Sequence, residues 1–285
     1  MLRWEVVSKR ELAPQIKALR IYAPEVAKTA KPGQFVILMV DEKGERIPLT
    51  LADWSEETGL IELVFLEVGV STLKLGMKRP GERLYYLVGP LGNPSDIRPY
   101  KKVVLVGGGV GAPALYPIAR AFNQLKSYVI TIIGARTSHL LVYEEKLRSV
   151  SDEIYITTDD GSRGIRGFTS DALEMVLNEE KDVDAVWLVG PAVMMKVCSE
   201  ITKRYGVRTF ASLNPIMVCG VGMCGACRVS VDGKIMFTCI DGPEFDAHKV
   251  NWDELIARLA MYRKEEEHAL RLFKRRISIK GVSDA

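Results

Sequence analysis

Apolar and polar residues alternate in short runs along roughly the first third of the chain. WEVVSKRELA, IKALRIYA, GQFVILMV and LIELVFLEV show the two-residue period of β-strands, and Pro and Gly separate these runs. Short alternating strands joined by such turns are typical of a small antiparallel β-barrel. We therefore predict a barrel over residues 1–98.

The pattern changes near Arg98-Pro99, where apolar strands begin to alternate with helical stretches. KKVVLVGGG, YVITIIGAR, EIYITTDDG and AVWLVGP are buried-type runs that end in glycine-bearing turns. Strands at this spacing predict an α/β domain with a Rossmann-like parallel sheet. We assign this domain to residues 99–213, with the next joint near Asn214-Pro215.

Residues 251–285 form a C-terminal extension with a helical pattern. Within NWDELIARLAMYRKEEEHALRLFKRRISIK, apolar residues recur near helical spacing, namely Trp252, Leu255, Leu259, Tyr262, Ala269, Leu270 and Phe273. We predict a helix whose apolar stripe packs on the chain's own core, with a partner-facing helix as the alternative. The basic end, Arg271 to Lys280, is expected to be solvated.

Composition adds limits on the function. The chain has 285 residues, of which 47% are hydrophobic and 26% charged, so it has the material of an ordinary globular protein with several cores. A net charge of only +3 argues against a nucleic-acid partner. The sequence shows neither a signal-like start nor an apolar run long enough to span a bilayer, so we expect an intracellular, cytoplasmic protein without a membrane partner.

Four of the five cysteines fall in the segment VCGVGMCGACRVSVDGKIMFTC. Thiols stay reduced inside cells, so clustered cysteines there indicate metal binding or redox chemistry more than disulfides. Cys219, Cys224, Cys227 and Cys239 have the plant-type [2Fe-2S] spacing, C-x4-C-x2-C followed by a distant fourth Cys. We predict these four as cluster ligands in a small domain over residues 214–250.

The residues around these thiols suit a cluster loop. Gly220, Gly222 and Gly225 allow the positive φ angles that a loop around a cluster needs. RVSVDGKIMFTC predicts a hairpin turning at Asp232-Gly233, which returns the fourth thiol to the loop. A zinc knot or free buried thiols are the alternatives. The fifth cysteine, Cys198, lies on a predicted helix and is expected in the core.

A glycine corner follows the first strand of the α/β domain. Gly107, Gly109 and Ala112 satisfy the G-x-G-x-x-G/A spacing of a dinucleotide-binding turn, although a corner without a ligand fits the motif alone equally well. The acidic residue expected about twenty positions later is absent, and Arg136 stands near its place. The choice between NAD and NADP therefore stays open. Asp159-Asp160 is either a polar turn or part of a ligand site.

The predicted barrel carries groups that suit an anionic, dinucleotide-like cofactor. ERIPLTLAD places Arg46 near the hydroxyl of Thr50, and VGVSTLKL places Gly69, Ser71 and Thr72 where a helix begins. A guanidinium, hydroxyls and helix N–H groups would fit a flavin with its pyrophosphate. Surface arginines and ordinary helix caps are the alternative explanation.

The order of the motifs resembles the ferredoxin-NADP reductase superfamily over about residues 1–250. The motifs are PGQF, RIPLT, GPLG, GGGVG, TDDG and VGP, followed by the cysteine loop. The chain most closely resembles the electron-transfer subunits of dihydroorotate dehydrogenase type B and the small subunit of NADH-dependent ferredoxin:NADP oxidoreductase, also called sulfide dehydrogenase. Ile47-Pro48-Leu49 departs from the R-x-Y-S/T motif of many superfamily reductases, and these two groups of subunits share that departure.

The resemblance implies an assignment of cofactor-binding positions. For FAD these are Arg46, Pro48, Leu49, Thr50, Gly69, Ser71 and Thr72. For the nicotinamide nucleotide, NAD(H) or NADP(H), they are Gly107, Gly108, Gly109, Gly111, Arg136, Asp159, Asp160, Gly161, Gly190 and Pro191. Neither the motifs nor the resemblance requires a side chain that acts as acid or base, and we expect His139 and His248 to be solvated or capping.

The resemblance also implies a function. We expect an oxidoreductase subunit that exchanges a hydride between NAD(H) and FAD and passes single electrons through the cluster to a partner. The C-terminal extension favours the small subunit of the ferredoxin:NADP oxidoreductase, whose large flavin and iron–sulfur subunit handles NADP(H) and ferredoxin, with electron bifurcation as a further implication. The alternatives are an electron-transfer subunit of dihydroorotate dehydrogenase B and a redox-sensing module without turnover.

Overall fold

The N-terminal part is an antiparallel barrel-like sheet, as predicted. Its six strands run in the order β1-β2-β5-β4-β3-β6, with bounds β1 Val6–Ala13, β2 Ile16–Tyr22, β3 Phe35–Met39, β4 Ile47–Ser55, β5 Leu60–Leu66 and β6 Tyr86–Leu91. An isolated bridge between Glu5 and Arg83 joins the two ends of this order. Inward-facing residues such as Leu19, Leu38 and Leu63 are fully buried, which fits the alternation in the sequence.

Two short helices accompany the barrel. Helix α1, Pro24–Thr29, begins with proline at its first turn, where the missing N–H would have had no partner. Helix α2, Val70–Met77, begins directly after Gly69. The structure is a computed structural model that describes residues 1–283 and the side chains of residues 1–279, so the last residues of the predicted extension 251–285 lie outside it.

A seven-stranded sheet forms the second part, in the order β10-β9-β8-β7-β11-β12-β15. The strands are β7 Lys102–Gly108, β8 Tyr128–Ala135, β9 Glu153–Thr158, β10 Ile165–Arg166, β11 Ala185–Val189, β12 Arg208–Ser212 and β15 Glu244–Asp246. All neighbours pair in parallel except β15, which runs antiparallel to β12. This is the predicted α/β architecture with one added edge strand.

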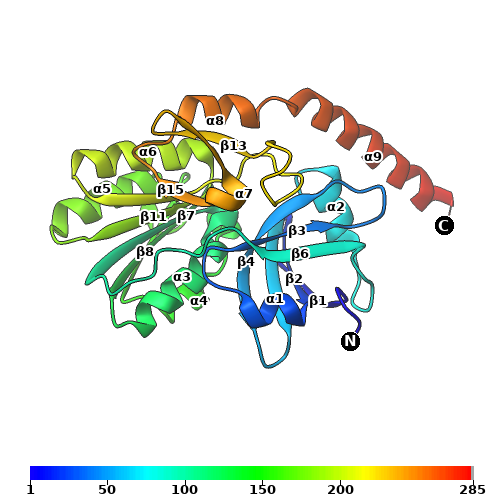
Figure 1. Ribbon diagram of the computed structural model, residues 1–285, viewed down its shortest axis with the longest axis horizontal. Coiled ribbons are helices and arrows are strands. Elements are labelled where there is room, and N and C mark those ends of the chain that lie inside the picture. Colours follow the sequence, from blue (N-terminus) through cyan, green and yellow to red (C-terminus); the bar gives the residue numbers. More distant parts are fainter. Residues whose placement is uncertain (284–285) are drawn as a thin grey trace.

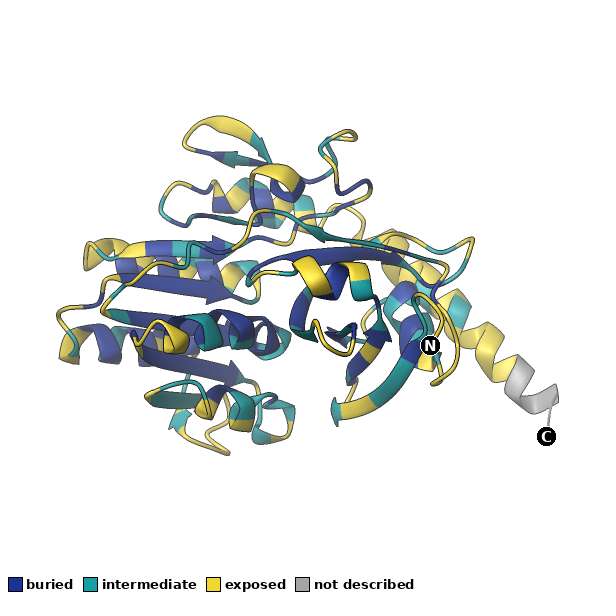
Figure 2. Cartoon of the chain, turned by 60° about the horizontal axis from the view of Figure 1, so that its bottom comes forward, coloured by how far each residue is buried: buried dark blue, intermediate teal, exposed yellow. Residues whose placement is uncertain are grey.

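Helices cover both faces of this sheet (Figure 1). They are α3 Ala112–Gln124, α4 Glu144–Arg148, α5 Thr169–Glu179 and α6 Ala192–Arg204, with 3₁₀ turns η1 Gly109–Gly111 and η2 Ser138–Leu140. On β7, Val103 and Leu105 pack with α3 and α4, while Val104 and Val106 pack with α5 and α6. Because both faces are buried, the strands read as continuous apolar runs rather than alternating ones. Figure 2 shows the buried sheet between its helices.

The cysteine segment folds as a small unit over these two parts (Figure 1). Strands β13, Arg228–Val231, and β14, Lys234–Phe237, form the predicted hairpin, followed by helix α7, Thr238–Asp241. Its turn residues Asp232 and Gly233 both have positive φ, as a tight hairpin turn of this kind requires. The chain then returns to the large sheet as β15. The predicted domain bounds stay predictions, since β15 lies within 214–250 and pairs with the α/β sheet.

The C-terminal extension contains two helices rather than the single predicted one. Helix α8, Trp252–Leu259, buries Trp252 and Leu255 against the α/β core, which fits the self-packing expectation. Helix α9, Arg263–Ser283, then turns toward the barrel and extends past it (Figure 1). Leu259 and Tyr262, at the join, are exposed. Cys198 is fully buried in the core as predicted. In the part of the chain that the structure describes, every helix is too short or too polar to span a membrane.

Candidate functional site

The glycine corner lies where the strand order of the large sheet reverses. β8 flanks β7 on one side and β11 flanks it on the other, so the carboxyl ends of β7 and β11 border the crevice where open α/β sheets bind ligands. A Cβ on Gly111 would lie 2.1 Å from the carbonyl oxygen of Val189, and a Cβ on Gly108 would lie 2.5 Å from Met194 Sδ. The structure thus brings the corner together with Gly190 and Pro191.

The remaining residues predicted for the nucleotide follow the next two strands at the same edge. Arg136 comes after β8 and is exposed, and its carbonyl accepts from the Asp160 amide at 3.3 Å. The Asp160 carboxylate accepts from Ser162, which lowers the pKa of this carboxyl. Asp159 to Gly161 therefore form a well-bonded polar turn beside Arg136. A ligand role for either group stays a prediction.

The RIPLT segment presents alternate residues to opposite sides of the barrel wall. Pro48 lies directly opposite Ile37 and Thr50 opposite Phe35, so these side chains share the face on which Ile37 and Phe35 meet the cysteine unit. Leu49 points the other way and packs on the barrel core, leaving mainly its backbone for a ligand.

Proline is tolerated at position 48 because β4 has a partner on only one side there. Its residues 47–50 pair with β3, and pairing with β5 begins at Leu51. The stretch from Arg46 to Thr50 consequently borders a free strand edge, and Arg46 is exposed there with its guanidinium 5.3 Å from the ring centroid of Tyr86. An unpaired edge beside a cation can accommodate a polar, anionic group.

The beginning of α2 has the features of an anion-binding helix end. The Thr72 hydroxyl accepts from the amides of Gly69 and Val68 at 3.0 and 3.1 Å, which fixes the entry into the helix. The first amides inside the helix have no intrahelical acceptor and point toward the incoming chain. Ser71 donates to Glu45 at 2.9 Å, so a carboxylate lies near this helix end in the structure. A pyrophosphate fits the same donors.

The nucleotide corner lies against the barrel. Val110, at the centre of the corner, packs against a cluster that contains the barrel residues Ala52 and Val64, and Leu66 packs against the same cluster. Leu66 ends β5 and leads within a few residues into the Gly69 turn. The predicted dinucleotide corner and the predicted flavin turn therefore border the same part of the barrel surface.

The four cysteines of the loop make two pairwise contacts. Cys227 Sγ lies 3.3 Å from Cys239 Sγ, and the backbone amide of Cys224 donates to Cys219 Sγ at 3.4 Å. Among the described residues, no three Cys, His, Asp or Glu side chains gather closely enough to hold one metal ion. Two thiolate pairs fit a cluster that contains two iron ions and takes four cysteine ligands.

Backbone amides surround the sulfurs. Cys219 Sγ accepts from the amides of Cys224 and Val221, and Cys239 Sγ accepts from Gly222 at 3.2 Å. Burial opposes ionisation of Cys219, but these amides outweigh it and lower the pKa of the thiol to about 6. Burial, followed by the neighbouring Cys227, raises the pKa of Cys239 to about 12. A loop that already directs N–H groups at sulfur is suited to hold thiolate ligands.

The cysteine loop also rests directly on the barrel. Gly220, Gly222 and Gly225 all have positive φ, as expected for the loop, and a Cβ on Gly220 would lie 2.6 Å from Ile37 Cδ1. The cysteine loop packs on Ile37 of β3, and Ile37 pairs with Pro48 of β4. Only one strand therefore separates the cysteine loop from the segment predicted to bind the flavin.

Sequence reasoning missed the groups that fix this loop in place. Asn93, in the turn after GPLG, donates through Nδ2 to the carbonyl of Ile240 at 3.0 Å and through its amide to Gly242 at 2.7 Å. Glu244 accepts from the hydroxyl of Ser95 at 2.6 Å and from Trp187 Nε1 at 3.1 Å. Burial raises the pKa of Glu244 to about 7, against the effect of these hydrogen bonds. The turn chemistry of GPLGN was the only sequence signal.

A second missed group is a polar network between the barrel and the α/β domain. Glu62 of β5 is buried and accepts from Tyr143, Lys146 and Arg20. Burial raises the pKa of the Glu62 carboxyl, but these donors outweigh it and lower the pKa to about 2. Lys146 also bonds Asp53 of β4. Tyr143 has positive φ, a strained conformation held by this contact.

Comparison with known proteins agrees with this geometry. The iron-sulfur cluster binding domain of dihydroorotate dehydrogenase B matches residues 214–251. The chain is 48% identical over 263 residues to a Thermotoga maritima protein named as a homolog of the dihydroorotate dehydrogenase B (NAD(+)) electron transfer subunit, covering 92% of this chain and 93% of that protein. The electron transfer subunit of Geobacillus thermodenitrificans is 35% identical over 257 residues, covering 87% of this chain and 97% of its own.

The fold has relatives among solved structures. A chain of the NADH-dependent reduced ferredoxin-NADP oxidoreductase, solved in a study of flavin-based electron bifurcation, superposes with a TM-score of 0.91 at 46% identity, covering 96% of this chain and 98% of its own. The ferredoxin reductase in carbazole 1,9a-dioxygenase shares the fold at a TM-score of 0.61, with 22% identity over 71% of this chain and 65% of its own. The chain therefore belongs to the family of dihydroorotate dehydrogenase B electron transfer subunits and their homologues.

Proposed function

We propose that this chain is an electron-transfer subunit that exchanges a hydride between NAD(H) and FAD and relays single electrons through a [2Fe-2S] cluster to a partner protein. The observation that carries the proposal is the position of the paired thiols. The cysteine loop packs on Ile37, which pairs with Pro48 in the segment assigned to the flavin. Hydride donor, flavin and cluster would then be neighbours, with the barrel surface between them.

Each part of the chain has a separate task in this proposal. The corner from Gly107 to Gly111, with Gly190 and Pro191, would hold the nucleotide, and Val110 keeps that corner against the barrel. Arg46, Pro48 and Thr50 would lie along the flavin, while the α2 amides take its pyrophosphate. FAD would supply the conversion of two-electron to one-electron chemistry when bound. The protein supplies proximity and orientation, and hydride transfer asks for no acid or base.

A partner receives the electrons beside the cysteine loop. Val218, Val221, Met223 and Ile240 are exposed apolar residues in and next to this loop, and such a patch is typical of an interaction site. We assign the partner as a large flavin and iron–sulfur subunit that handles NADP(H) and ferredoxin, in a heterodimer, and place the complex in the cytoplasm, where thiols stay reduced. The solved chain of the ferredoxin-NADP oxidoreductase superposes over 96% of this chain, which supports this choice.

A dihydroorotate dehydrogenase B catalytic subunit is the second candidate partner. The names of the relatives favour it, but the Geobacillus thermodenitrificans subunit is matched over 97% of its length while covering only 87% of this chain. Part of this chain thus has no counterpart there. Co-purification separates the candidates, because recovery with a dihydroorotate dehydrogenase catalytic subunit in place of the large reductase subunit would reverse the assignment.

An anaerobic visible spectrum of the full chain tests the function itself. We expect flavin bands over a broad iron–sulfur absorbance. One equivalent of NADH should bleach them in part, since it supplies two of the three electrons that FAD and the cluster together accept, and NADPH should bleach them less readily. A colourless protein would contradict the proposal and favour the zinc alternative. Flavin that bleaches far more slowly than any plausible turnover would favour the redox-sensing module.

A further inference from the structure

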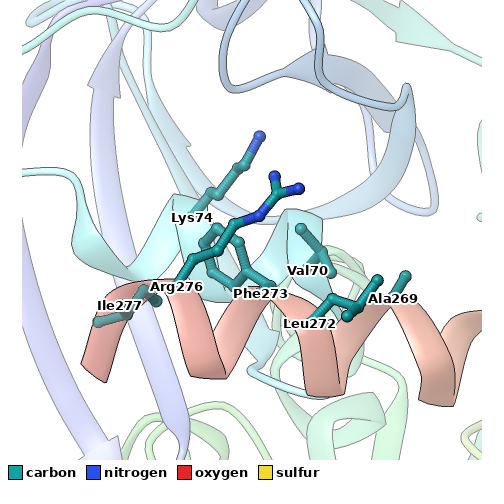
Figure 3. Close-up of a pocket in the computed structure, with 7 residues that line it drawn as sticks. All are labelled: Val70, Lys74, Ala269, Leu272, Phe273, Arg276 and Ile277. Atoms are coloured by element: carbon teal, nitrogen blue, oxygen red, sulfur yellow. The ribbon is translucent and has the colours of Figure 1, made fainter. Parts of the chain in front are cut away.

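A groove of about 440 Å³ separates helix α9 from helix α2 (Figure 3). Its walls include Val70 and Lys74 of α2 and Ala269, Leu272, Phe273 and Arg276 of α9. The volume lies in the range of small-molecule sites, roughly 300–1,000 Å³. Both helices are needed to form the groove, and α9 of the C-terminal extension supplies most of its lining residues.

The chemistry of the groove suits a flat ring that carries an anionic group. Phe273, Leu272 and Val70 provide apolar and aromatic surface, and Figure 3 shows the charged ends of Lys74 and Arg276 on the same side of the groove. Lys74 Nζ is held by Asp41 at 2.8 Å and lies 5.9 Å from the Phe273 ring centroid. Arg276 has no acidic partner within salt-bridge distance among the residues that the structure describes, so its charge is available to a ligand.

The groove begins where the flavin pyrophosphate is assigned. Val70 is the first residue of α2 and follows Gly69 directly, so it borders both the helix amides and the groove. A dinucleotide whose pyrophosphate lies on these amides has its adenosine half within reach of Phe273. Resting on the proposed function, we infer that the groove between α2 and α9 receives the adenosine of FAD, with the adenine against Phe273 and Arg276 beside the phosphates.

The inference gives the C-terminal extension a ligand-binding role. An exposed apolar face alone would suggest a protein partner, but here aromatic surface, the guanidinium of Arg276 and the helix amides adjoin one another. Stacking of a base on an aromatic side chain contributes about 1–3 kcal/mol, which corresponds to roughly 5- to 150-fold in affinity. Helix α9 would therefore raise the affinity for FAD and leave the affinity for FMN, which lacks the adenosine, unchanged.

The experiment compares FAD and FMN binding to the flavin-stripped full chain by fluorescence titration. We expect Phe273→Ala to weaken FAD binding at least fivefold and to leave FMN affinity unchanged. Arg276→Gln should weaken FAD binding in a salt-dependent way, and should weaken FMN, which has one phosphate fewer, to a smaller extent. Arg275→Gln and Ile279→Ala, which change residues outside the groove lining, are the matched controls and should leave both flavins unaffected.

Three other outcomes would overturn the inference. Equal weakening of FAD and FMN would mean that Phe273 only supports the fold, and unchanged FAD affinity would exclude the adenosine from the groove. Loss of partner binding with unchanged FAD affinity would make the groove a protein contact. If the unsubstituted chain binds neither flavin, the proposed function itself is wrong. That result differs from a variant that binds both flavins and has lost only the preference for FAD over FMN.

Discussion

The sulfur atoms of single residues carry the clearest chemistry of this chain. Cys224 belongs to the paired thiols of the loop, whereas Cys198 is buried in the α/β core, where burial raises its pKa to about 12. We expect Cys224→Ser to abolish the iron–sulfur absorbance and electron paramagnetic resonance signal while flavin remains bound, because one ligand to iron is lost.

The matched control for this substitution is Cys198→Ala, which removes a thiol of the core. This variant should keep the full cluster spectrum. Its free energy of unfolding should fall by a few kcal/mol at most, because the substitution leaves only a small cavity. Equal cluster content in both variants would contradict the assignment of Cys224 as a ligand.

Two glycines, one at the nucleotide corner and one between α6 and β12, distinguish the effect of a steric clash from that of backbone strain. A Cβ on Gly111 would lie 2.1 Å from the Val189 carbonyl, whereas Gly206 has φ of +66° and open space around its Cα. We expect Gly111→Ala to weaken NADH binding at least tenfold, because the corner must move away from β11. Gly206→Ala should cost about 1 kcal/mol of stability and leave NADH binding unchanged. NADH titration and urea unfolding measure both, and equal NADH affinities would show that the corner tolerates the movement.

Residue-level chemistry could be predicted where spacing alone decides it. The glycines of the loop predicted the positive φ angles that the structure contains, while the assignment of the four cysteines as cluster ligands stays a prediction. Glu244 and Glu62 could not be predicted, because their partners lie far away in sequence and a glutamate in a strand is ordinarily solvated.

At the scale of elements, Glu244 links strand β15 to two other parts of the chain. It accepts hydrogen bonds from Ser95, in the segment after the barrel, and from Trp187 on β11. Its pKa in the folded state, about 7, exceeds the 4.5 of an exposed glutamate, so the folded protein holds this proton more tightly. Stability from this group is therefore greatest below pH 4.5, falls as the pH rises to about 7, and is constant above that.

Substitution of Glu244 should remove that dependence. We expect Glu244→Gln to be more stable than the parent at pH 8, by on the order of 3 kcal/mol, and nearly equal to it at pH 4.5. Urea unfolding at several pH values, followed by tryptophan fluorescence, measures this. Glu62 does not affect this comparison. Its pKa in the folded state is about 2, so the stability that it contributes is lost only below pH 4.5. Parallel pH profiles of parent and variant would contradict the prediction.

The network at Glu62 holds the barrel to the α/β domain. Tyr143→Phe removes the hydroxyl that donates to a buried carboxylate, so we expect a loss of about 1.5–3 kcal/mol in the free energy of unfolding. Arg10 contacts the same carboxylate, but its side chain is 51% exposed, and Arg10→Gln should cost less than about 1 kcal/mol. Urea unfolding compares the variants, and a larger cost for Arg10→Gln would reverse this ranking.

A strand or helix could be predicted from the sequence where its apolar residues follow one period and pack on one surface. Alternation predicted the barrel, and apolar runs with helices between them predicted the parallel sheet. The C-terminal extension was predicted as a single helix because its apolar residues recur near helical spacing, but these residues pack on two different surfaces. Trp252 and Leu255 pack on the α/β core, whereas Ala269 and Phe273 face α2 of the barrel, and one straight helix could not reach both. The return of β15 was hidden because three residues, Glu244–Asp246, give no readable period.

In the whole molecule, the barrel is the common support. The nucleotide corner rests on it through Val110, the cysteine loop through Gly220, and helix α9 through the α2 groove. Each contact joins segments that are distant in sequence. Their relative placement was therefore beyond prediction from spacing and became available only through the resemblance of motif order.

Electron delivery to a partner is the last step that this arrangement supports. Met223, in the cysteine loop, is 83% exposed and belongs to the exposed apolar patch that also contains Val218, Val221 and Ile240. We expect Met223→Asp to weaken binding of the large subunit at least tenfold, since a charge at the centre of a docking patch is costly to desolvate. NADH bleaching of the flavin should stay unchanged, because the corner and the barrel are untouched. Phe168→Asp, at an exposed apolar position before α5, is the control and should bind the subunit normally. Surface plasmon resonance with the large subunit measures both variants, and unchanged binding of Met223→Asp would mean that electrons leave through another face.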